Sequence, residues 1–343
     1  GDPHRLGGPL MSPILSVLDL SPVTGNATQA QAVRETIEVA RAAERLGYNR
    51  FWVAEHHNIG TLGSAAPEIL IAALTQATST IRLGSGGVML VNYSPLKVAE
   101  VFMELEALAP GRIDLGVGRA LGTDPRTGAA LRTSGSEAFP QYFALLNAWL
   151  LDAAGKEPIT DAHPARGIHA NPAGPSHPDL FLLCSSPESA AFAGQAGVGM
   201  AYAEFIARSS GGPAIAAYRR AFQPSVFRER PCAITATIAL AAETDEEAQR
   251  LAAPMRAGNL ALMMNAPRRF PSIPEAQAFL EANRNHPAYD AVMARGIVGE
   301  ASFVRAELAA QATREDADEI FVMAVGADLQ SRIRSLELIK AQP

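Results

Sequence analysis

The sequence has few cysteines, no cluster of basic residues and no long hydrophobic run. Two cysteines, Cys184 and Cys232, cannot build a disulfide framework in 343 residues, which favours a reducing, cytoplasmic setting. A net charge of -6 argues against nucleic acid as a partner, because phosphate contacts need clustered lysine and arginine. The longest apolar stretches, such as 180–184 and 233–242, fall well short of the roughly 20 residues that cross a bilayer, so no membrane span is expected.

What is present is the composition of an ordinary folded protein. Hydrophobic residues make up 48% of the chain and charged residues 19%, enough for a sizeable core. Residues 1–10 precede the first methionine and carry no hydrophobic period, so we interpret them as an expression remnant. Residues 11–343 are predicted to form a single domain.

From residue 14 onward, short apolar or β-branched runs alternate with longer segments of helical spacing. The predicted strands are 14–20, 50–54, 81–90, 113–117, 179–184, 198–201, 232–240 and 319–322. The predicted helices are a first one that ends at Gly47, then 67–78, 95–108, 136–151, 188–195, 212–222 and 245–264, and a last one with Leu329, Ile333, Leu336 and Ile339 on one face. Eight strands, each followed by a helix, predict a (β/α)8 barrel (TIM barrel), with a doubly wound open sheet as the alternative.

Two stretches interrupt this alternation. Residues 158–178 are dense in proline, glycine and histidine, and prolines also interrupt 265–299. Loops of this length are more often lids or binding elements than neutral connectors. We therefore expect both to be insertions over the C-terminal face of the barrel.

In a barrel, the active site lies where the strands end, and the residues after the predicted strands are polar or glycine-rich. His56 and His57 follow the second strand, and because adjacent side chains of an extended segment point to opposite sides, only one should face the cavity. That imidazole could exchange a proton near neutral pH, or it could simply close the barrel rim. A metal site is not expected, since the remaining candidate ligands lie in a proline-rich stretch without a scaffold. These are His163, His169 and His177.

Glycines inside the third strand are unusual. Gly86 and Gly87 indicate a close backbone approach, either to a flat ligand or at a bend of the barrel. The glycine-rich run 116–122 matches a dinucleotide loop only weakly, because no helix opens directly there. Arg119, in that run, suits a phosphate or an anionic ring, or else a salt bridge at the rim.

The segment after the fifth strand is a candidate anion site. Ser186 can cap the next helix, Pro187 suits its first position, and the free amides at a helix start can hold a phosphate. Simple capping is the alternative, which the acidic Glu188 favours. Cys184 is interpreted as a core residue rather than a nucleophile.

Taken in order, several of these segments resemble the bacterial luciferase-like flavin-dependent monooxygenases. They are 51–57 (FWVAEHH), 81–90 (IRLGSGGVML), 95–100 (PLKVAE), 111–119 (GRIDLGVGR), 185–189 (SSPES) and 317–322 (ADEIFV). The resemblance covers nearly the whole chain and is nearer to a subgroup found in bacterial biosynthetic pathways than to the light-emitting luciferases. Gly118 stands where luciferase has a reactive cysteine, and no obvious equal of its longer mobile loop is present.

The resemblance implies a cofactor and residue roles. Reduced FMN (FMNH2), supplied by a separate flavin reductase, would react with O2 to a flavin C4a-peroxide and oxygenate a small organic or polyketide-like substrate. His56 would lie near the reactive flavin carbon, Arg119 would contact the cofactor, and Gly86-Gly87 would form a cis peptide beneath the ring. The phosphate would be bound by Ser185, Ser186 and Ser189. A homodimer is implied through helices 67–78 and 95–108.

Two other hypotheses stay open. A deazaflavin-dependent oxidoreductase of the same superfamily would use the same mouth for hydride transfer without oxygen. A non-catalytic flavin-binding protein would bind the cofactor without turnover. Binding of FMNH2 or of the reduced deazaflavin distinguishes the first of these from a monooxygenase.

Overall fold

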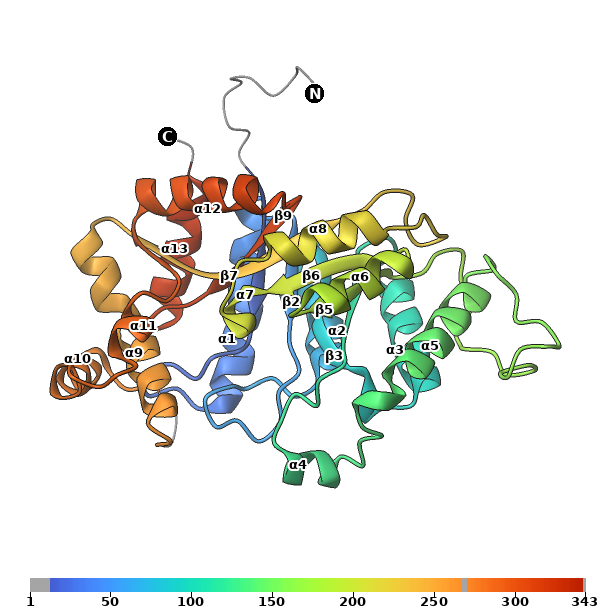
Figure 1. Cartoon of the computed structure of the whole chain (residues 1–343), viewed down its shortest axis with the longest axis horizontal. Coiled ribbons are helices and arrows are strands. Elements are labelled where there is room, and N and C mark those ends of the chain that lie inside the picture. Colours follow the sequence, from blue (N-terminus) through green and yellow to red (C-terminus); the bar gives the residue numbers. More distant parts are fainter. Residues whose placement is uncertain (1–12, 267–269, 342–343) are drawn as a thin grey trace, which may run out of the picture.

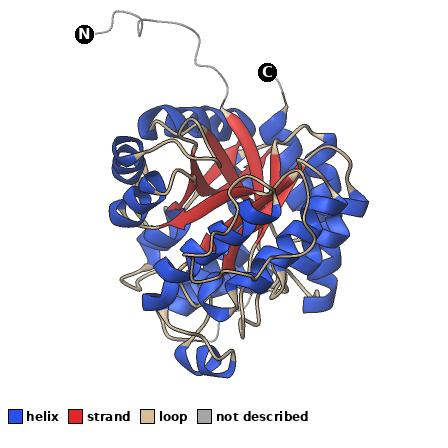
Figure 2. Ribbon diagram, turned by 90° about the vertical axis from the view of Figure 1, so that its right-hand side faces the viewer, coloured by secondary structure: helices blue, strands red, loops and turns tan. Residues whose placement is uncertain are grey.

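The sheet closes on itself as a parallel barrel inside a layer of helices (Figures 1 and 2). The computed structural model of the chain describes residues 13–266 and 270–341. Within them the barrel strands are β1 (Ile14–Asp19), β2 (Arg50–Val53), β3 (Arg82–Met89), β4 (Ile113–Gly118), β5 (Asp179–Cys184), β6 (Gly199–Ala203), β7 (Ala233–Ala242) and β9 (Glu319–Ala324). Neighbours in the chain pair in parallel, and β9 pairs with both β7 and β1. The (β/α)8 barrel is therefore confirmed, and the open sheet is excluded.

The helices begin and end where local signals place them. The larger ones are α1 (Gln29–Arg45), α2 (Pro67–Ala77), α3 (Pro95–Leu108), α5 (Phe139–Ala153), α6 (Pro187–Gln195), α8 (Gly212–Ala221), α9 (Asp245–Met263), α10 (Ile273–Ala282), α12 (Ala301–Glu315) and α13 (Leu329–Lys340); α4 (Pro125–Ala130), α7 (Glu204–Ala207) and α11 (Tyr289–Met293) are short. The Thr28 hydroxyl accepts a hydrogen bond from the Gln31 amide at the start of α1, and Gly47, with φ +75°, follows its end. None of the helices within the described residues is long and apolar enough to span a membrane.

One strand and one long helix were not expected from the sequence. The short strand β8 (Ile297–Glu300) pairs with the end of β7, over Ala239–Ala242, beyond the part of β7 that closes the barrel. Helix α12 then leads back to β9. The prolines of this region do not prevent helices: Pro274 occupies the first turn of α10, where its missing amide costs nothing.

The two insertions do not share one face of the barrel. Residues 158–178 connect the end of α5 to the start of β5, so they lie at the N-terminal end of the strands. They form the loop on the right in Figure 1. The expectation that they cover the C-terminal face was therefore wrong. The second stretch, 265–299, follows α9, and its last residues line a cavity with residues that follow β6.

Aromatic packing fills the inside of the barrel, and ion pairs close its N-terminal end. The Trp52 ring lies 4.6 Å from that of Phe321 and 5.0 Å from that of Phe181, centroid to centroid. At the strand starts, Arg50 is 2.9 Å from Asp114 and 3.1 Å from Glu319. With this end filled and neutralised, the opposite end is left for binding and chemistry.

Candidate active site

The ends of four consecutive strands carry every predicted site residue. Arg119 directly follows β4, Ser185 directly follows β5, and both side chains are exposed. His56 lies three residues after the end of β2 and is half-buried. Because β2, β3, β4 and β5 are neighbours in the barrel, these residues share one sector of its C-terminal rim.

A buried carboxylate organises the rim beside His56. Glu55 is 1% exposed. It accepts hydrogen bonds from the Met89 amide at 2.9 Å, the Tyr93 hydroxyl at 2.9 Å and the Asn92 amide nitrogen at 3.2 Å. Burial, and then the negative charge of Glu55, raise the pKa of Tyr93 above its usual value, so this phenol stays a donor. Glu55 therefore links the end of β2 to the end of β3 and the residues after it, and no motif indicated this link.

The two adjacent histidines have different partners. The His57 Nε2 atom lies 2.8 Å from the Glu55 carboxylate, and its carbonyl accepts a hydrogen bond from the Thr123 hydroxyl at 2.8 Å. The His56 amide donates to the Ser64 carbonyl at 3.1 Å. His57 is thus held in the structural cluster around Glu55, and the assignment of His56 to the cavity stays a prediction.

The glycines of β3 are explained by close contacts and by one unusual peptide bond. The bond between Gly86 and Gly87 is cis, as the resemblance implied. A Cβ atom on Gly87 would lie 2.6 Å from the Gly116 carbonyl oxygen, and one on Gly84 would lie 2.5 Å from Trp52 Nε1. Side chains are therefore excluded by the protein itself, whether or not a flat ligand lies against this strand.

The start of α6 combines a cap with accessible donors. The Ser186 hydroxyl accepts from the Ser189 amide at 3.3 Å, and the Ser189 hydroxyl accepts from the Ser186 amide at 3.3 Å, which forms a capping box. Glu188, in the first turn of α6, is exposed. Hydrogen bonds from its own backbone amide, and then from the Ser186 hydroxyl, lower the pKa of its carboxyl group. The capping alternative is therefore realised. The remaining donors, Ser185 and Arg119 on the neighbouring strand, still fit a phosphate at this corner.

The thiol beside this corner is not a nucleophile. Cys184 is buried in the hydrophobic core, and burial raises its pKa to about 12. At neutral pH it therefore stays protonated, as expected for a core residue.

The candidate metal ligands are spread out. The Nδ1 atom of His169 lies 2.7 Å from Asp152, that of His163 accepts a hydrogen bond from the Ala165 amide, and that of His177 faces the Pro178 carbonyl. In residues 13–266 and 270–341, no group of three or more histidine, cysteine, aspartate or glutamate side chains is arranged to hold a metal ion.

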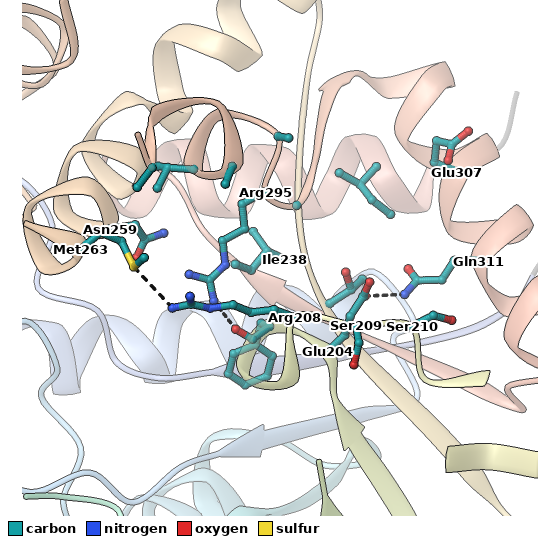
Figure 3. A pocket seen from close by; sticks show the side chains of 18 of the residues that line it. Glu204, Arg208, Ser209, Ser210, Ile238, Asn259, Met263, Arg295, Glu307 and Gln311 are labelled. Carbon is teal, nitrogen blue, oxygen red and sulfur yellow. Dashed lines mark hydrogen bonds between the residues drawn. The ribbon is translucent and has the colours of Figure 1, made fainter. Parts of the chain in front are cut away.

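A cavity of about 520 Å³ lies beside the rim, between β6, β7 and the second insertion (Figure 3). It opens on β7 between Ala236, where the pairing with β6 ends, and Ala239, where the pairing with β8 begins. Its charged and polar lining includes Glu204, Arg208, Asn259, Arg295, Glu307, Gln311 and Arg314. Sequence reasoning missed this cavity, because its walls come from five separate segments between residues 204 and 314 that carry no shared motif.

The family model for luciferase-like monooxygenases matches residues 15–323. The chain belongs to this family of enzymes. A luciferase-like monooxygenase of Escherichia coli (strain K12) is 37% identical over 327 residues, covering 94% of this chain and 95% of its own. The N-acetyl-S-alkylcysteine monooxygenase of Bacillus subtilis (strain 168) is 42% identical over 192 residues, 56% of this chain and 57% of that one.

Solved structures share the fold over nearly the whole chain. The crystal structure of apo-MsnO8 superposes with a TM-score of 0.85 at 37% identity, covering 97% of this chain and 98% of that chain. At 19% identity, the oxygenating constituent of 3,6-diketocamphane monooxygenase from Pseudomonas putida, a complex with FMN, has a TM-score of 0.68 and covers 96% and 97% of the two chains. The latter likeness shows the barrel fold alone.

Proposed function

We propose that this luciferase-like monooxygenase binds reduced FMN at the ends of β2, β3, β4 and β5 and transfers one atom of O2 to a small organic substrate. The observation that carries the proposal is the position of His56, the closely packed glycines of β3, Arg119 and the start of α6 in one sector of the rim. A distant relative by fold is an FMN complex, which supports the choice of cofactor. The reduced flavin would come from a separate reductase.

Each residue has a distinct task in this proposal. Arg119, Ser185 and the amides at the start of α6 would hold the phosphate, since a fixed guanidinium and free helix amides suit a dianion. The glycines of β3 would leave room for the flat ring. When bound, reduced FMN supplies the two electrons that oxygen transfer requires.

His56 would hold or move a proton at the reaction centre. An imidazole can donate a hydrogen bond or accept a proton, which suits this task. Its neighbour His57, held by Glu55 at 2.8 Å, would keep the segment in place instead. Exclusion of water would come from the rim loops around both residues.

The name of one relative suggests a test substrate. The Bacillus subtilis N-acetyl-S-alkylcysteine monooxygenase matches somewhat more than half of this chain. We therefore propose a small thioether such as N-acetyl-S-methylcysteine as a first substrate to test. With O2 and FMNH2 it would give the sulfoxide, oxidised FMN and one water, which balances the two electrons and two protons that the flavin supplies.

The test compares His56→Ala with His57→Ala. Anaerobic titration measures the affinity for FMNH2, and mixing with oxygen measures product formed and hydrogen peroxide released per O2 consumed. We expect His56→Ala to keep the affinity within about tenfold but to lose product yield by about 10²- to 10⁴-fold and release hydrogen peroxide. His57→Ala should act mainly through lower stability.

The alternatives give different results. Tight binding of the reduced deazaflavin F420 with no binding of FMNH2 would replace this proposal by the deazaflavin-dependent oxidoreductase; an F420-dependent secondary alcohol dehydrogenase shares the fold at 15% identity, with a TM-score of 0.67. Binding of FMNH2 followed by its reoxidation to FMN and hydrogen peroxide, with no oxygenated product from any substrate tested, would indicate a flavin-binding protein. Equal product yields for His56→Ala and the parent would remove His56 from the proposal.

A further inference from the structure

Two arginines from separate segments meet in the cavity beside the rim. Arg208 directly follows α7, and Arg295 lies two residues before β8. Figure 3 shows both side chains reaching into the same part of the cavity, and Arg295 also donates a hydrogen bond to the Phe205 carbonyl. The two guanidinium groups are close enough for the charge of one to act on the other.

The hydrogen-bond partners of these two cations, within the described residues, are uncharged. Arg295 binds the Phe205 carbonyl, and Arg208 contacts the thioether of Met263 at 3.8 Å. Among the residues that the structure describes, no carboxylate forms an ion pair with either. At the other end of the barrel, by contrast, Arg228 is paired with Asp179.

This arrangement is electrostatically incomplete. Burial lowers the pKa of the half-buried Arg295, and repulsion by Arg208 lowers it further. Two like charges held together in a partly buried site are stabilised by an anion between them. Arg208 is exposed, so a ligand can reach the pair.

We propose that Arg208 and Arg295 bind the carboxylate of the substrate. This assignment rests on the proposed monooxygenase function and adds the substrate class to it. The wall around the pair is apolar: Ile238 and Val292 line the cavity, and Leu262 and Met263 are exposed at 49% and 42%. The site therefore takes an organic acid with a hydrophobic part rather than a bare inorganic ion.

The acidic side of the cavity orients such a ligand. Glu204 accepts a hydrogen bond from Gln311 at 2.6 Å, and Figure 3 places both, with Glu307, away from the two arginines. Arg314 also lines the cavity and offsets part of the charge of Glu204, so this side attracts a ligand carboxylate less than the arginine pair does. The ligand is thereby fixed with its acid group toward the second insertion.

The same chemistry could serve the phosphate of the flavin instead. The predicted phosphate contacts follow β4 and β5, whereas the arginine pair follows β6 and precedes β8. We therefore assign the pair to the substrate, and the experiment separates the two sources by measuring flavin and acid binding on the same variants.

The experiment uses hexanoate and its uncharged counterpart hexanamide as probes, by ligand-detected NMR titration of the full chain. The variants are Arg208→Gln and Arg295→Gln, with Arg220→Gln, exposed on α8, as the matched control. We expect hexanoate to bind the parent and the control equally and each cavity variant roughly ten- to hundredfold more weakly, as for the loss of a charge-assisted hydrogen bond. Binding of hexanamide should not change.

Three results would overturn the assignment. The parent could fail to prefer hexanoate over hexanamide, the cavity variants could bind hexanoate as well as the control does, or they could lose affinity for FMNH2 by the same factor as for hexanoate. The last result would mean that the two arginines bind the cofactor rather than the substrate. Arg208→Gln removes no hydrogen bond to the backbone, so it keeps the test valid if Arg295→Gln does not fold. Because the acid binding is measured without flavin, its failure is distinct from failure of the monooxygenase reaction.

Discussion

Replacing Glu55 by Gln tests whether one buried carboxylate holds the rim in place. One carboxylate oxygen receives His57, Asn92 and Tyr93, and the other receives the Met89 amide at 2.9 Å. Glutamine has only one carbonyl oxygen. If the glutamine oxygen faces the three side-chain donors, the glutamine NH2 group faces the Met89 N–H. Two hydrogen-bond donors then face each other in a buried site.

The magnitude follows from the groups left without an acceptor. One buried donor without a partner costs about 1–3 kcal/mol, and the three other bonds lose the strengthening that a charged acceptor gives. We therefore expect Glu55→Gln to lower the free energy of unfolding by about 2–4 kcal/mol. Tyr93→Phe, which removes one donor and leaves the carboxylate satisfied by others, should cost about 1 kcal/mol.

Urea unfolding followed by tryptophan fluorescence measures these differences, with Glu104→Gln on the exposed face of α3 as the control. Surface substitutions of this kind usually stay within about 0.5 kcal/mol of the parent. A Glu55→Gln variant that unfolds at the same urea concentration as the control would refute the reasoning. It would mean that the four contacts are not a net source of stability.

Two further predictions concern cofactor binding and assembly. Replacing Ser185 and Ser186 together by Ala should weaken FMNH2 binding by about 1.5–3 kcal/mol for each hydrogen bond lost to a charged group. The far-UV circular dichroism spectrum should stay unchanged, which shows that the fold is intact. An unchanged dissociation constant for FMNH2 would mean that the phosphate does not bind at the start of α6. The chain should form a homodimer through α2 and α3, which expose Ile69 and Leu108, and a monomer mass by light scattering at micromolar concentration would contradict this.

The barrel could be predicted from the sequence because most of its strands are apolar runs that alternate with segments of helical spacing. Strand β8 could not, since only Val298 and Gly299 of its four residues are buried. Helix α12 was missed for another reason. Its buried face includes Gln311 and Glu315, which bond Glu204 and Ser210, so the hydrophobic stripe that marks a helix is interrupted.

The sequence could place a residue at the rim where that position depends on its own strand. His56, Arg119 and Ser185 each come just after a strand, so their position at the rim follows from the barrel alone. The Glu55 cluster and the arginine pair depend on contacts between distant segments. Arg208 and Arg295 come together through the extension of β7 and its pairing with β8. No local sequence pattern predicts this pairing.

This difference separates the two halves of the site in physical terms. The half at β2 to β5 consists of residues inside barrel strands or within a few residues of their ends. The half at β6 to β8 is built from α7, α9, α11 and the second insertion, which contact the barrel mainly through the extended end of β7. Changes in the insertion can therefore alter the arginine pair and the apolar wall without moving β3 or β4. Affinity for the acid and affinity for the flavin should respond to different substitutions, which is the condition under which one barrel can serve different substrates with one cofactor.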